Sequence, residues 1–118
     1  MKKILAVASY EKQKYYLEQA FQALPASIQE EVRVLCVLLA QKLMCTFVVG
    51  FYEDGEVYFE TVLRDDDFNF DDIGAQLEIK EIYRKKKDLL ASLSLWYRIY
   101  FTEEGYKLKQ EIAEEAGL

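Results

Sequence analysis

The densest group of side chains that could do chemistry is an acidic run at residues 65–72. Carboxylates and one amide stand at alternate positions: Asp65, Asp67, Asn69 and Asp71. This is how a calcium loop presents oxygen ligands to a hard cation. However, Phe70 stands where that loop needs glycine, and Gln76 stands where it needs a bidentate glutamate. Two interpretations remain, a cation site or an acidic loop that caps the next helix.

The other residue types that commonly carry chemistry argue against most classes of enzyme and metal site. The chain has no histidine, which excludes Ser-His and Cys-His dyads, His-ligated metals and imidazole pH switches. Cys36 and Cys45 lie in apolar runs without a CxxC spacing, which predicts buried free thiols in a reducing compartment. No phosphate loop and no nucleophile elbow is present, and Glu60 is the one further acid that we consider. We expect a protein that is not an enzyme and has no cofactor or metal.

A basic turn at Arg84–Lys87 is the strongest cluster of positive charge. Clustered cations can bind phosphate or anionic lipid. Glu81 and Asp88 flank this turn, which favours the alternative of a solvated stretch of helix. A pairing with an acidic segment of a second copy is a third interpretation.

An apolar and aromatic block follows the basic turn. Three of its aromatic side chains carry a polar tip, as is common at half-buried protein interfaces. We predict these interaction residues: Leu89, Leu93, Trp96, Tyr97 and Tyr100. Packing of the same side chains into the core is the alternative.

Composition predicts one globular domain over residues 1–118, since 52% of the residues are hydrophobic. The net charge of −6 and the pI near 4.7 argue against nucleic-acid binding. Gln41 and Lys42 interrupt the longest apolar run, and the apolar stretch near the N-terminus is too short for a secretion signal. We therefore expect a cytoplasmic protein without a membrane span.

Two helices are predicted in the first part of the chain. Apolar residues at helical spacing predict an amphipathic helix from Ser9 to Leu24, which Pro25 ends. The capping-box pattern from Ser27 to Glu30 predicts the start of a second helix, apolar nearly all round and hence covered on several sides.

A β-hairpin should follow, with strands at Cys45–Tyr52 and Glu56–Arg64. A two-residue loop would place a carboxylate on the apolar face. A three-residue loop with Gly55 in the left-handed conformation avoids this. It predicts these pairs: Phe51 with Val57, Val49 with Phe59, and Phe47 with Thr61.

The element that dominates the predicted architecture is one long helix at about residues 71–101. Its last 27 residues contain no Gly or Pro, and its apolar positions alternate at spacings of four and three, as in a heptad seam. At roughly 40 Å it would exceed a domain of about 35 Å, so we expect it to overhang the body and to pair with a second copy. A last helix should begin at Thr102 and end near Gly117.

Several short motifs, taken in order, resemble a family of short uncharacterised proteins from anaerobic Gram-positive bacteria. The motifs are Ser9-Tyr10, Tyr15-Tyr16, Leu24-Pro25, Asp54-Gly55, Asp71-Asp72-Ile73-Gly74, Lys80-Glu81-Ile82, and Leu93 with Tyr97. The resemblance covers about residues 9–101 and implies a bacterial cytoplasmic protein of unknown function, with no catalytic residues.

The sequence therefore predicts a single helix-rich α+β domain of order ααββαα with a two-stranded antiparallel hairpin. We expect a small acidic protein–protein interaction module that is homodimeric. Two alternatives remain open: a ligand- or metal-binding protein that uses the acidic run, and an acidic inhibitor or chaperone-like partner of a basic protein.

Overall fold

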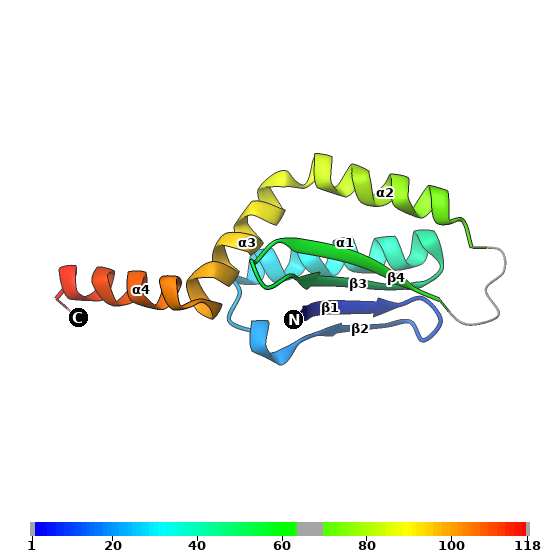
Figure 1. The fold of residues 1–118 in the computed structure, drawn as a ribbon. Coiled ribbons are helices and arrows are strands. Elements are labelled where there is room, and N and C mark those ends of the chain that lie inside the picture. Colours follow the sequence, from blue (N-terminus) through cyan, green and yellow to red (C-terminus); the bar gives the residue numbers. More distant parts are fainter. Residues whose placement is uncertain (1, 64–69, 118) are drawn as a thin grey trace.

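The computed structural model describes residues 2–63 and 70–117 and shows an α+β fold (Figure 1). Its elements in chain order are β1 (Lys3–Ser9), β2 (Lys14–Leu17), the 3-10 helix η1 (Gln19–Phe21), α1 (Ala26–Leu43), β3 (Thr46–Phe51), β4 (Val57–Val62), α2 (Asp72–Lys85), α3 (Lys87–Phe101) and α4 (Glu103–Glu115). The α+β class is confirmed. The order ααββαα is wrong, because an unexpected strand, β1, begins the fold, the first expected helix is β2 and η1, and the long helix is two helices.

In place of the helix predicted from Ser9 to Leu24, the chain turns back from the end of β1 and forms β2 and then η1. Tyr15 and Leu17 face the core, whereas Tyr16 between them is exposed, and this alternation is that of a strand. Gln13 closes the turn before β2 with a φ of 53°. The short apolar run now forms β1, whose pairing with β2 and β3 overrides the helical spacing.

The sheet has four antiparallel strands in the order β2-β1-β3-β4, rather than the two strands expected. The predicted register between β3 and β4 is confirmed, because Phe51 pairs with Val57 and Val49 pairs with Phe59. Gly55 has a φ of +91°, as the predicted loop requires. Strand β1 separates β2 from this hairpin and contains an irregularity between Ile4 and Ala6.

Helix α1 lies along one face of the sheet and supplies a large share of the core (Figure 1). It begins one residue before Ser27, and its N-cap is Pro25 without a side-chain cap, so the capping box is not used. Val34 and Leu38 are exposed, whereas the sequence predicted a helix covered on several sides.

The predicted long helix is broken at Lys86, where φ is −111° and ψ is 30°. Lys86 occupies a position of the heptad seam, and burial there would remove its charged ammonium group from water. The bend leaves Lys86 exposed, and the apolar blocks on both sides of it pack against the same core. The seam residues that become buried are Ala75, Ile79, Ile82, Leu89, Leu93 and Trp96. The heptad spacing therefore marks the side that faces the chain's own core and not a partner helix.

Helix α4 begins where predicted and points away from the body (Figure 1). The molecule measures 58 × 26 × 25 Å, and its radius of gyration is 16.2 Å. A compact domain of this length would have a radius of gyration of about 13 to 14 Å. The overhang expected of the long helix is thus supplied by α4. Within the described residues, no helix combines the length and the apolar character that a membrane crossing requires.

Candidate interaction surface

The predicted interaction residues lie mostly in the core. Leu89, Leu93, Trp96 and Tyr97 are all buried. The Tyr97 ring stacks on Phe51 of the sheet, with ring centroids 4.8 Å apart. These four side chains belong to the chain's own core, which favours the alternative of core packing for them. Tyr100, stacked on Trp96, is the member of the set that remains exposed.

The carboxylates considered for a cation or a catalytic role do not converge in the described structure. Residues 65–69 lie outside the described residues. The Asp71 carboxylate caps α2, because its Oδ1 accepts a hydrogen bond from the Gly74 amide at 2.8 Å. Asp72 and Glu60 are exposed. Among the described residues, no three His, Cys, Asp or Glu side chains gather as a metal site would need.

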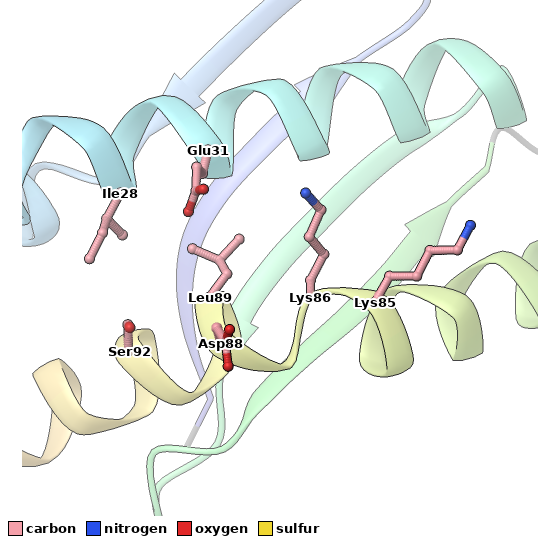
Figure 2. A pocket seen from close by; sticks show the side chains of 7 residues that line it. All are labelled: Ile28, Glu31, Lys85, Lys86, Asp88, Leu89 and Ser92. Carbon is pink, nitrogen blue, oxygen red and sulfur yellow. The ribbon is translucent and has the colours of Figure 1, made fainter.

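The basic turn borders a groove of about 270 Å³ between α1 and the bend that joins α2 to α3 (Figure 2). Its lining residues are Ile28, Glu31, Lys85, Lys86, Asp88, Leu89 and Ser92. Two ammonium groups and two carboxylates share this groove, so their charges offset each other. Arg84 and Lys85 each also pair with Glu81, at 2.9 and 3.4 Å. This geometry favours the solvated interpretation over a phosphate or lipid patch.

A larger apolar surface lies on the face of the sheet opposite the core. Alternate residues of each strand point to this face, which we call the open face. Its apolar side chains are Ile4, Val7, Tyr16, Val48, Tyr52, Tyr58 and Val62. Its charged residues are Lys2, Lys14 and Glu60, with Glu18 beside the Tyr16 hydroxyl at its edge. In the described part of the chain, every helix that packs on the sheet packs on the other face, together with Phe47, Val49 and Phe51.

The centre of the open face is built around Gly50. Tyr58 lies directly across from Gly50, and its ring covers the glycine so closely that a Cβ there would come within 2.5 Å of the ring. The Lys2 ammonium lies 4.9 Å from the centroid of the same ring. Tyr58 and Val48 are nearly inaccessible, yet neither belongs to the core cluster. They are covered by neighbours on the sheet and not by a second layer.

The rim of the open face is accessible. Tyr16 on β2 and Val62 on β4 are 54% and 46% exposed, and Ile4 on β1 is similarly exposed. An antiparallel sheet usually places polar residues on a solvated face. A contiguous apolar patch on such a face is typical of an interaction surface.

Sequence reasoning missed the open face because it recognised only two of the four strands. The signal was nonetheless present, since Tyr52, Tyr58 and Val62 were all assigned to the predicted hairpin. The apolar run that forms β1 contributes Ile4 and Val7 to the same face. The predicted hairpin therefore already carried apolar residues on its second face. Without β1 and β2, however, these residues did not form an extended surface.

Comparison with known proteins gives a family but no functional relative. No curated protein and no solved structure matches the chain. A family model described as a family of unknown function, DUF6145, matches residues 2–105, which span all four strands, α1 to α3 and the start of α4. This agrees with the resemblance to uncharacterised proteins noted in the sequence. The chain therefore belongs to the DUF6145 family of unknown function.

Proposed function

We propose that this protein is a protein–protein interaction module that forms a homodimer through the open face. The observation that carries the proposal is a sheet with apolar side chains on both faces and, among the residues that the structure describes, helices on only one of them. Burial of apolar surface stabilises association by roughly 25 cal/mol per Å² before the costs of ordering. The exposed rim at Tyr16, Ile4 and Val62 is where that gain is available.

The open face replaces the surface predicted from the sequence. Tyrosine is favoured at interfaces because its ring buries apolar area while its hydroxyl remains hydrogen-bonded. The open face contributes Tyr16, Tyr52 and Tyr58, whereas Trp96 and Tyr97 belong to the core. It also lies within the region that the family model covers. A cytoplasmic location and the absence of a catalytic role remain parts of this proposal.

Analytical ultracentrifugation of the full chain over a wide range of concentration tests the proposal. We expect a dimer that dissociates on dilution. Tyr16→Glu and Val62→Glu should each weaken it, because each places a charge in a desolvated contact. Val34→Glu on the exposed side of α1 is the matched control and should not. A chain that stays monomeric at all concentrations, or a dimer that both open-face variants leave intact, would contradict the proposal.

A further inference from the structure

A second apolar surface in this chain is uncovered, and it lies on α4. The exposed apolar side chains of this helix include Leu108 and Ile112, which lie one turn apart on the same side. Gly105 is the only residue of α4 that is buried. An isolated helix of 13 residues is marginal in water, because most helical stability in proteins comes from packing of an apolar side.

The junction between α3 and α4 holds this helix away from its own sheet. Thr102 caps α4, with its Oγ1 accepting a hydrogen bond from the Gly105 amide at 3.1 Å. Gly105 packs so tightly on the end of α3 that an added Cβ would come within 2.0 Å of the Arg98 carbonyl oxygen. The Lys109 ammonium lies 4.4 Å from the centroid of the Tyr100 ring of α3. These contacts hold α4 in the projecting direction seen in Figure 1, in which it does not cover the open face of the same chain.

We propose that the apolar side of α4 docks on the open face of a second copy, and that two copies exchange these helices reciprocally. This inference rests on the proposed function, and it names the occupant of the open face. A closed two-fold exchange covers both uncovered surfaces of each chain at once. No additional partner is then needed to account for either surface.

The two surfaces agree in length. A helix of 13 residues is about 20 Å long, and strands of six residues span about 20 Å. One copy of α4 therefore matches the length of the strands in the open face.

The charges of the two surfaces favour this contact over pairing of α4 with a second α4. Helix α4 carries five glutamates and two lysines, so its net charge is negative. The open face carries Lys2, Lys14 and Glu60, and the Glu18 carboxylate lies against the Tyr16 hydroxyl at its edge, so its charges nearly cancel. With Leu108 and Ile112 facing the sheet, helical geometry places Glu111 on one flank and Lys109 on the other. Pairing of two copies of α4 would oppose like charges, whereas docking of α4 on the open face, whose charges nearly cancel, would not.

Cysteine cross-linking between two different variants tests the contact directly. Ile112→Cys is purified separately from Val62→Cys, Tyr16→Cys and Ile4→Cys, and each open-face variant is mixed with Ile112→Cys under mild oxidation. The native Cys36 and Cys45 are buried and occur in every sample. We expect a mixed disulfide dimer with at least one open-face variant. Ile112→Cys mixed with Val34→Cys is the control and should give none.

The dissociation constant of the unmodified dimer gives the second measurement. Leu108→Glu and Ile112→Glu should each raise it by about tenfold or more, as expected for the loss of a central apolar contact. Lys107→Glu, on the polar side of α4, is the matched control for added charge.

The outcomes separate this inference from the proposed function. If the open-face variants dissociate the dimer and the α4 variants do not, the proposed function stands and the exchange of α4 is overturned. If Ile112→Cys cross-links only with itself, α4 pairs with α4 and the inference is again overturned. If the chain is monomeric at all concentrations, both the proposed homodimer and the exchange of α4 are overturned.

Discussion

The two faces of the sheet are apolar for different reasons. On the inner face Phe47, Val49 and Phe51 are in the core and contact helices. On the open face Val48 and Tyr58 reach similar burial outside the core cluster, and the Tyr58 ring is flanked by Lys2 and Tyr52. The difference shows that a low exposed fraction does not by itself place a residue in the core. What covers a residue decides how much it contributes to stability and whether a partner can contact its surroundings.

The largest expected effect compares adjacent residues of β3 that point to opposite faces. Phe47→Ala should lower the free energy of unfolding by about 3 to 5 kcal/mol, because it leaves a cavity among fully packed residues. Val48→Ala should cost only about 1 kcal/mol, because no second layer covers Val48. Urea unfolding of both variants, at a concentration where the chain is monomeric, measures this difference. Equal costs would mean that the open face is packed as tightly as the core.

A smaller effect is expected at the centre of the open face. Gly50→Ala should lower the free energy of unfolding by about 1 to 3 kcal/mol, because the new methyl group collides with the Tyr58 ring. The same substitution in a Tyr58→Ala background should cost much less, since the ring is then absent. A double-mutant cycle measured by urea unfolding gives the coupling between the two positions. Additive costs would show that Tyr58 does not lie over Gly50.

The smallest expected effect compares Tyr15 on the inner face with Tyr16 on the open face. Among the described residues, the buried Tyr15 hydroxyl has no hydrogen-bond partner. Tyr15→Phe should therefore raise the free energy of unfolding by about 1 kcal/mol. Tyr16→Phe is the control, and it should stay within about 0.5 kcal/mol because Tyr16 is exposed. Thermal or urea unfolding at neutral pH measures both.

The pH dependence of stability gives an independent check on Tyr15. Burial raises the pKa of Tyr15 from 10.0 to about 12, with a smaller contribution from the nearby Cys36. The folded state therefore binds the Tyr15 proton more tightly than the unfolded state. This stability is fully present below pH 10 and is lost as the pH rises from 10 through about 12. Burial also raises the pKa of Cys36, from 9.0 to about 12. The stability that Cys36 contributes in this way therefore begins to be lost at a lower pH than that of Tyr15. Tyr15→Phe should make the loss between pH 10 and 12 shallower, and an unchanged slope would contradict the assignment.

Local patterns in the sequence predicted those elements whose partners lie close in the chain. The hairpin register followed from the position of Gly55 and the alternation of apolar residues, and both act between neighbouring strands. The starts of α2 and α4 followed from the capping side chains of Asp71 and Thr102, which contact the backbone three residues on. In each case the interactions that decide the structure are local.

Helical spacing misled where a distant strand was available. The residues from Ser9 to Leu24 have an amphipathic helical pattern, yet Tyr15 and Leu17 belong to a strand that pairs with β1. In the sheet, β1 forms backbone hydrogen bonds with β2 on one edge and with β3 on the other. The stability of the β1–β2 pair therefore depends on β3, which begins about 30 residues after β2 ends. For the same reason the open face, which combines residues from all four strands, could not be assembled from the sequence.

The sequence by itself determined the α+β class, the β3–β4 register, the starts of α2 and α4, and the apolar side of the segment that forms α2 and α3. Only the tertiary structure decided where that apolar side points. It broke the long helix at Lys86 so that Leu89, Leu93 and Trp96 pack on the chain's own core, and it left α4 to project. The physical reason is that periodicity fixes which side chains share a face. The surface that covers this face depends on contacts between residues far apart in the chain.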